Sequence, residues 1–163
     1  MTEMRMPDDL ILNADDEIKI RQNLTLVALG KRPADRILRV GRLFDVHGGN
    51  WFNNQDIVIC GRRIAWVGPA GEYPGDVAEI VEEPDLIAVP GFGEVHKHIE
   101  SSHLTPEHEA ALVLPHGATW TCEASHEFSN VNGLHNLEFW LAARRAGSPV
   151  KIFPLPGSAV PPT

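Results

Sequence analysis

The strongest constraint on the fold is the alternation of strand-like and helix-like segments in the second half of the chain. Apolar, strand-like runs occupy 87–100, 118–127 and 150–157, and helical patterns occupy 105–117 and 132–147. This β-α-β-α-β order favours a parallel sheet with crossover helices, because parallel neighbours cannot be joined by a tight turn. The sequence therefore predicts an α/β fold for this part of the chain.

The first half of the chain has a different pattern, in which short strand-like runs are separated by turn residues. A hairpin is expected around Gly61, where two apolar runs flank a Gly-Arg-Arg turn. Ahead of the strands, Ile20 and Leu24 recur at helical spacing. We therefore expect three parts, which are an N-terminal helical segment over 1–35, a small β domain over 36–86 and βα units over 87–163.

Charge and composition exclude several classes of protein. The 163 residues carry a formal net charge of −8 without a cluster of basic residues, which argues against a nucleic-acid-binding or anionic-membrane surface. No apolar run is long enough to span a bilayer, and the first ten residues lack the pattern of a secretory signal. Cys60 and Cys122 are too few for a disulfide framework. We therefore expect a cytoplasmic protein without nucleic-acid or membrane partners.

The segment GFGEVHKHIESS, residues 91–102, carries the residues with the clearest chemical potential. Side chains alternate along a strand, so His96, His98 and Glu100 share one face, with the two histidine Cα atoms roughly 7 Å apart. Neutral imidazoles at this spacing can converge on one zinc, iron, nickel or copper ion. A lone His-x-His pair is a weak motif, but this pair lies near the carboxyl end of a strand, where functional groups gather in parallel β/α folds. The sequence therefore predicts a metal site here.

His126 and Glu127 occupy the corresponding end of the second strand-like run. They are candidates for the same site, although a capping or hydrogen-bonding role explains such residues equally simply. Glu107 and Glu109 lie in the first turn of a helix, where the helix dipole accounts for them. We expect the remaining histidines of this half to be exposed or locally hydrogen-bonded, namely His103, His108, His116 and His135.

Longer motifs link the chain to a known family. The stretches VPGFGEVHKHIESSHLTPEHEAALVLPHG and HEFSNVNG, with the upstream ALGKRPADRILRVGRLFDV, resemble the adenine deaminase family of the amidohydrolase superfamily. The resemblance extends from about residue 26 to Thr163. It implies the start of a (β/α)8 metal-dependent hydrolase barrel, preceded by an N-terminal helix and by a β segment that forms part of a composite β-sandwich.

The resemblance also implies an activity and a set of roles. The enzyme would hydrolyse a carbon–nitrogen bond, converting the purine base adenine to hypoxanthine and ammonia. Two divalent transition-metal ions, manganese, iron or zinc, would activate the attacking water. His96 and His98 would hold one metal ion. The other candidates would line the mouth of the site or lie beside the ligands and the substrate, namely Glu100, Ser101, Ser102, His126 and Glu127.

The sequence departs from the family pattern near the predicted site. Glu94 stands where the family has Asp, and Lys97 replaces a small or apolar residue. Ala124 and Ser125 replace Asp-Pro. Because the second strand end shapes the pocket, a related amidohydrolase acting on another heterocycle or cyclic amide is one alternative. A catalytically silent scaffold homologue and a small, complete metal-binding module are the others.

The chain is short for a complete barrel. Residues 87–163 hold about two and a half βα units of roughly 30 residues each, whereas a barrel needs about 200 to 250 residues. We therefore expect an amino-terminal fragment that is inactive by itself. The catalytic acid/base residues and the remaining metal ligands are expected beyond Thr163. The expected partners are the remainder of the barrel or further copies in a homo-oligomer.

Overall fold

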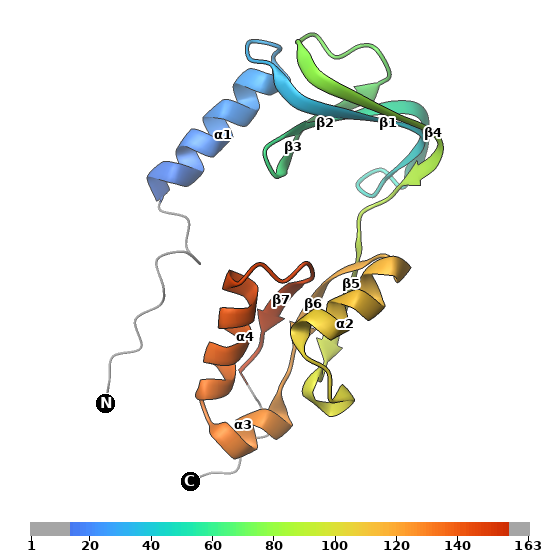
Figure 1. Ribbon diagram of the computed structural model, residues 1–163. Coiled ribbons are helices and arrows are strands. Elements are labelled where there is room, and N and C mark those ends of the chain that lie inside the picture. Colours follow the sequence, from blue (N-terminus) through green and yellow to red (C-terminus); the bar gives the residue numbers. More distant parts are fainter. Residues whose placement is uncertain (1–13, 157–163) are drawn as a thin grey trace. The chain divides into compact units, whose positions relative to one another are not determined.

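The computed structural model describes residues 14–156, and residues 1–13 and 157–163 lie outside this description. The chain divides after Pro90 into two compact units (Figure 1). The segments expected over 1–35 and 87–163 thus lie partly outside the described residues. No helix within residues 14–156 is long and apolar enough to cross a membrane.

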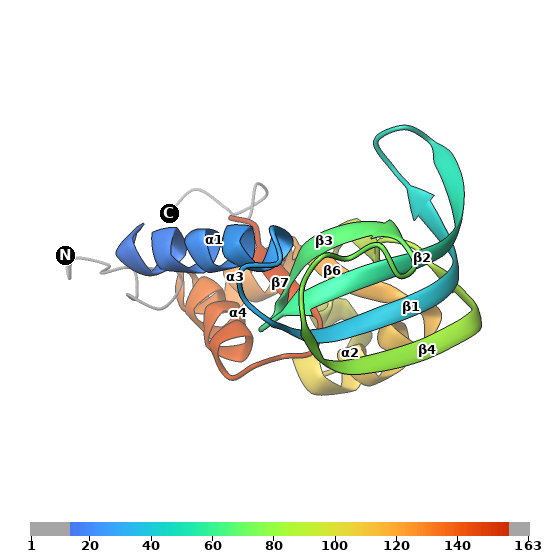
Figure 2. The same cartoon turned by 90° about the horizontal axis from the view of Figure 1, so that it is seen from above.

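The described part of the first unit, from residue 14 to residue 90, contains one helix and a four-stranded sheet (Figure 2). The helix α1 is Ala14–Ala28, and the strands are β1 Ala34–Asp45, β2 Asn50–Cys60, β3 Arg63–Pro69 and β4 Val77–Ala88. The strand order is β3-β2-β1-β4, with β1 antiparallel to β2 and parallel to β4. The predicted hairpin around Gly61 is confirmed, and Gly61 adopts a φ of 59° that glycine tolerates best.

Helix α1 packs against the sheet through a small apolar core. Val27 of the helix and Ala34, Ile37 and Val58 of the sheet form one buried cluster. The Tyr73 hydroxyl donates a hydrogen bond to the Val27 carbonyl at 2.8 Å. Ile20 and Leu24, which defined the predicted apolar face of the helix, are half-buried, and Val27 is fully buried.

An ion pair lies inside the first unit. Asp56 is fully buried and accepts hydrogen bonds from Arg39 Nε at 2.8 Å, Arg39 Nη2 at 3.0 Å and the Gly71 N–H at 2.8 Å. Burial by itself raises the pKa of Asp56, but the bonds from Arg39 and Gly71 outweigh burial and hold this pKa below its ordinary value. Asp56 is therefore an anion at neutral pH, and it ties β1 to β2 and to the loop after β3.

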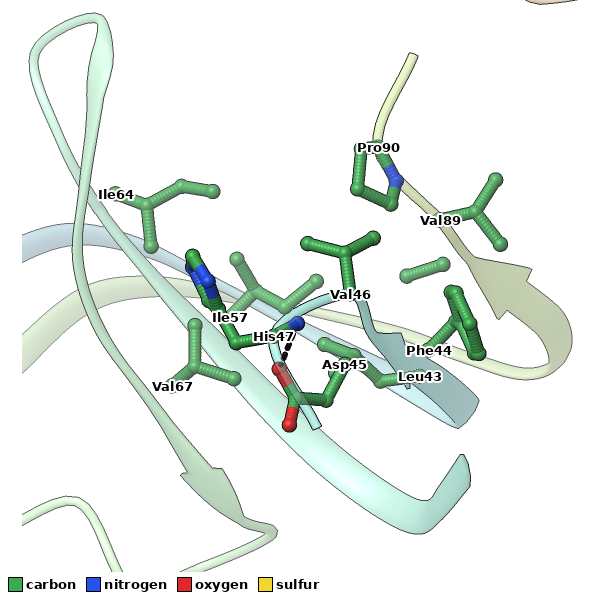
Figure 3. Close-up of a pocket in the computed structure, with 11 residues that line it drawn as sticks. Leu43, Phe44, Asp45, Val46, His47, Ile57, Ile64, Val67, Val89 and Pro90 are labelled. Atoms are coloured by element: carbon green, nitrogen blue, oxygen red, sulfur yellow. Dashed lines mark hydrogen bonds between the residues drawn. The ribbon is translucent and has the colours of Figure 1, made fainter. Parts of the chain in front are cut away.

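A pocket of about 450 Å³ lies beside the ends of β1 and β4 in the first unit (Figure 3). Its walls are mainly aliphatic and include Ile57, Ile64 and Val67. The backbone N–H of His47 donates to Asp45 Oδ1 at 3.0 Å beside these walls. The pocket carries few polar groups and does not contain the residues predicted to bind metal.

Over residues 91–156, the second unit is built on three parallel strands in the order β5-β6-β7. These are Phe92–Lys97, Ala118–Glu123 and Lys151–Pro154. This confirms the parallel α/β arrangement predicted from the alternating segments. The predicted run over 87–100 is wrong in one respect, because β4 ends before Pro90 and β5 begins after it. Proline lacks the N–H that a continuous ladder needs.

Helices connect the parallel strands. The connection from β5 to β6 contains two short 3₁₀ turns, η1 Glu100–Ser102 and η2 Leu114–His116, and helix α2 Pro106–Val113. The connection from β6 to β7 contains α3 His126–Asn132 and α4 His135–Arg145. The predicted strand over 118–127 is too long, because its last two residues begin α3. Trp140 of α4 packs with Ile99 and Ile152 in the buried core of this unit, so α4 covers the sheet.

Candidate metal centre

The candidate ligands lie where two neighbouring parallel strands end. His96 is in β5, His98 follows that strand directly, and His126 is the first residue of α3. Because β5 and β6 are parallel neighbours, their carboxyl ends lie at the same edge of the sheet. The sheet topology therefore brings residues about thirty positions apart into one cluster.

The three imidazole rings converge. His96 Nε2 lies 3.1 Å from His98 Nε2, and the His126 ring centroid is 4.9 Å from that of His98 and 6.3 Å from that of His96. One nitrogen from each ring lies within 4.8 Å of the others. Two nitrogens that each lie about 2.1 Å from one ion, at octahedral or tetrahedral angles, are about 2.9 to 3.4 Å apart. The separation in the structure fits a shared transition-metal ion, so the residues present suit this group.

Glu127 contacts the His98 ring. Its Oε2 lies 3.0 Å from His98 Nδ1, and its Oε1 accepts a hydrogen bond from the Ser101 hydroxyl at 3.2 Å. Ligand histidines commonly donate their second N–H to a carboxylate, which fixes the tautomer and leaves the other nitrogen for the ion. The Glu127 backbone N–H, followed by the side chains of Glu100, His98 and Ser101, lowers the pKa of Glu127. Glu127 is therefore an anion at neutral pH.

A second pair of carboxyl groups lies beside His98. Glu100 Oε1 is 3.8 Å from His98 Nδ1, and both Glu100 oxygens are shielded from solvent. Glu123, at the end of β6, is fully buried. Burial, and then the neighbouring Glu100 carboxyl, raise the pKa of Glu123 above its ordinary value. His98, Glu100 and Glu127 form a second group whose ligand atoms could meet at one ion.

The structure thus gathers most of the residues that the sequence singled out. Ser102 is different, because its hydroxyl donates to the Ile99 carbonyl within the same turn. The cluster therefore consists of His96, His98, Glu100, Ser101, His126 and Glu127.

Comparison with known proteins places the chain in a family. No protein-family model matches it. It is 76% identical to adenine deaminase 2 of Bradyrhizobium diazoefficiens over 158 residues, which cover 97% of this chain and 25% of that protein. It is 72% identical to adenine deaminase 2 of Jannaschia sp. over 163 residues, covering 100% of this chain and 26% of that protein. The chain belongs to the adenine deaminase family. It spans about a quarter of the length of these relatives.

Two solved structures resemble this adenine deaminase family chain in fold. One is a prolidase complexed with N-methylphosphonate-L-proline, at 20% identity and a TM-score of 0.52, covering 74% of this chain and 31% of that chain. The other is a Xaa-Pro dipeptidase with bound methionine, at 18% identity and a TM-score of 0.52, covering 75% of this chain and 33% of that chain. At these identities the likeness concerns the fold alone.

The other histidines of the second unit do not belong to the candidate ligand groups among the described residues. His108 Nδ1 is 2.9 Å from Thr105 Oγ1, and His135 Nδ1 is 2.9 Å from Glu138 Oε2. All four are exposed, as predicted, namely His103, His108, His116 and His135.

Two acidic residues of this adenine deaminase family chain are buried with partners that the sequence did not predict. Glu109 is buried and forms an ion pair with Lys97, so the helix dipole alone does not account for it. Lys97 therefore points away from the histidines on either side of it. Glu123 accepts two hydrogen bonds beside the cluster. Its position as the one charged residue of the strand ATWTCE was the signal in the sequence that could have indicated this role.

Proposed function

We propose that this chain supplies part of the active site of a metal-dependent adenine deaminase, which converts adenine to hypoxanthine and ammonia. The observation that carries the proposal is the convergence of three imidazoles at the ends of adjacent parallel strands. The identity of 72–76% to proteins named adenine deaminase supports the choice of substrate. A purine base is thus the proposed small-molecule partner.

In this proposal His96 and His98 hold one ion through their Nε2 atoms, with His126 beside them. The ion is a divalent transition metal, manganese, iron or zinc, and two ions are expected in each polypeptide. Such an ion supplies a strong nucleophile near neutral pH by lowering the pKa of water.

The residues around the imidazoles hold and orient them. The Glu127 carboxylate accepts the Nδ1 proton of His98 in a hydrogen bond, which leaves Nε2 unprotonated and able to bind a cation. The Ser101 hydroxyl donates to the other oxygen of Glu127 and limits its rotation. Glu100 places a carboxyl oxygen 3.8 Å from His98 Nδ1, and oxygen ligands of this kind also suit a divalent cation.

The second unit is proposed to be the beginning of a (β/α)8 barrel. Three parallel strands with helical crossovers match the start of such a barrel, and the relatives are about four times as long as this chain. The β domain at 36–86 is proposed to contribute to a composite β-sandwich, with 1–35 as a helical extension. The catalytic acid/base residues and further ligands are proposed to come from the rest of the barrel, and the protein is proposed to act in the cytoplasm, as a homo-oligomer.

The proposal is tested on the full-length protein that contains this sequence. After loading with manganese, iron or zinc, we expect about two ions per polypeptide and release of ammonia from adenine. The His98→Asn variant is expected to lose metal and activity, whereas the matched control His103→Asn, at an exposed histidine outside the cluster, is expected to retain both. A full-length protein that binds no metal and releases no ammonia would instead be a silent scaffold. The 163-residue chain alone is expected to release no ammonia.

A second substrate class is favoured by one specific feature. Ala124 and Ser125 are buried next to His126, at the strand end where the sequence departs from the family pattern. A pocket changed at this place could accept another heterocycle or a cyclic amide. Comparing turnover of adenine with turnover of other aminopurines and of cyclic amides distinguishes the two substrate classes.

A further inference from the structure

The last residue of β6 has an unusual environment for an acidic side chain. Glu123 has an exposed fraction of 0%, and both of its carboxyl oxygens accept hydrogen bonds. The Ile99 backbone N–H donates to Oε2 at 2.9 Å, and the Ser125 hydroxyl donates to Oε1 at 2.7 Å. A buried carboxyl group is unfavourable unless such bonds compensate for its lost hydration. The presence of a buried carboxyl group at this position therefore suggests that it has a specific role.

The two donors come from two different segments, and each is next to a candidate ligand. Ile99 directly follows His98, and Ser125 directly precedes His126. The ladder between β5 and β6 reaches the pair Lys97 and Glu123, and the Ala124 N–H donates to the Lys97 carbonyl at 2.8 Å. Beyond this last backbone hydrogen bond, the Glu123 side chain joins the segment that follows β5 to the segment that follows β6.

The segment that contains Ser125 is also hydrogen-bonded to helix α4. Asn136 of α4 has an exposed fraction of 0%, and its Nδ2 donates to the Ser125 carbonyl at 3.1 Å and to Ser129 Oγ at 2.8 Å. The segment leading to His126 is therefore fixed both to the sheet and to helix α4. The Glu123 carboxyl is the side chain that links this fixed segment to the residue after His98.

We propose that Glu123 is a positioning residue that holds His98 and His126 in the arrangement that binds a cation. This inference rests on the proposed function, because it assumes that the imidazole cluster binds metal. Glu123 acts through the backbone at Ile99 and through Ser125, without contacting the ion. Loss of its hydrogen bonds releases the segment after β5 from the segment before α3, so the imidazoles lose their mutual placement while the strands stay paired.

The test uses the full-length protein with two substitutions at one position. Glu123→Met removes both hydrogen bonds and keeps a similar volume. Glu123→Gln keeps them, because the glutamine carbonyl can accept from Ile99 and its amide can donate to the Ser125 hydroxyl. The affinity for Zn²⁺ is measured by competition with a chelator, and the absorption spectrum of the Co²⁺-loaded protein reports the ligand geometry. Glu123→Met is expected to weaken Zn²⁺ binding by about 10–100-fold and to change the Co²⁺ bands, as is typical for loss of an orienting partner. Glu123→Gln is expected to restore both properties.

Controls separate positioning from loss of stability. Asp56→Asn weakens a buried ion pair in the first unit and is expected to lower thermal stability without changing Zn²⁺ affinity. If Glu123→Met does not fold, the variant Ser125→Ala tests the positioning role instead. It removes only one of the two hydrogen bonds to Glu123 and is expected to give a smaller loss of Zn²⁺ affinity. Zn²⁺ affinity equal to wild type in the folded Glu123→Met variant, or in Ser125→Ala where it decides, overturns the positioning role alone. A wild-type protein that binds no Zn²⁺ overturns the proposed function itself.

Discussion

Replacing Arg39 by methionine leaves the buried Asp56 carboxylate with one remaining hydrogen-bond donor, the Gly71 N–H. In the native protein Arg39 contributes two bonds to Asp56, at 2.8 and 3.0 Å. Removing one partner of a fully buried ion pair costs about 3–5 kcal/mol of unfolding free energy. The Arg39 side chain is 29% exposed, so solvent screens part of its charge, and we expect about 3 kcal/mol, at the lower end of that range.

The pH dependence of this loss follows from the pKa of Asp56. Because the pKa is lowered in the folded protein, the pair stabilises the native state above the unfolded pKa of about 3.9, and this stability is lost as the pH falls through the folded pKa. In Arg39→Met the main bonds that lower the pKa are gone and burial raises it. The difference from wild type should therefore be largest at pH 7 and should shrink at acidic pH, where Asp56 is neutral in both proteins.

The assay is urea unfolding of the protein, followed by tryptophan fluorescence at pH 7 and at acidic pH. The double variant Arg39→Met/Asp56→Asn is the matched control, because its neutral amide can still accept from Gly71, and it should recover more than half of the loss. A loss below about 1 kcal/mol at pH 7 is the size expected for an exposed ion pair and would refute the reasoning. A loss that stays constant with pH would refute it as well.

Three further substitutions address other features. Lys97→Met leaves Glu109 buried without its cation and should lower the unfolding free energy by about 2–3 kcal/mol. Adding Glu109→Gln to this variant should recover part of the lost stability in thermal unfolding, and no recovery would argue against the ion pair. Trp140→Ala should cost about 3–5 kcal/mol, because the indole fills the core of the second unit, and a loss under about 1 kcal/mol in urea unfolding would show that α4 does not depend on it. His98→Ala in the full-length protein should weaken Zn²⁺ binding more than loss of an orienting residue does, which is typically about 10–100-fold. The affinity is measured by chelator competition, and an unchanged affinity would remove His98 from the ligand set.

The sequence was sufficient to predict those parts of the fold that depend on local patterns. Alternation along a strand predicted that His96 and His98 share one side, and the structure places their Nε2 atoms 3.1 Å apart. The hairpin at Gly61 and helix α4 also follow from local signals, which are a glycine between two apolar runs and an apolar face at helical spacing, although α4 spans His135–Arg145 and not the predicted 132–147. Such features require information from only a few neighbouring residues.

Features that depend on contacts between distant segments could not be predicted. Glu109 and Glu123 are acidic residues, for which exposure is the usual expectation. Their burial depends on partners supplied by another element, Lys97 for Glu109 and Ile99 for Glu123. Helix α3 was missed for a different reason. It has only seven residues, too few for an apolar period to appear, and its stability comes from packing against the rest of the unit.

The placement of Lys97 between two histidines has a consequence for how this gene segment can change. Deleting or inserting one codon inside β5 would exchange the two sides of the strand, directing an ammonium group into the imidazole cluster and the imidazoles toward the carboxylate of Glu109. Viable changes in length should therefore occur in multiples of two residues within β5, or outside it. Natural variants of this segment would then differ by substitution and seldom by a single-residue gap.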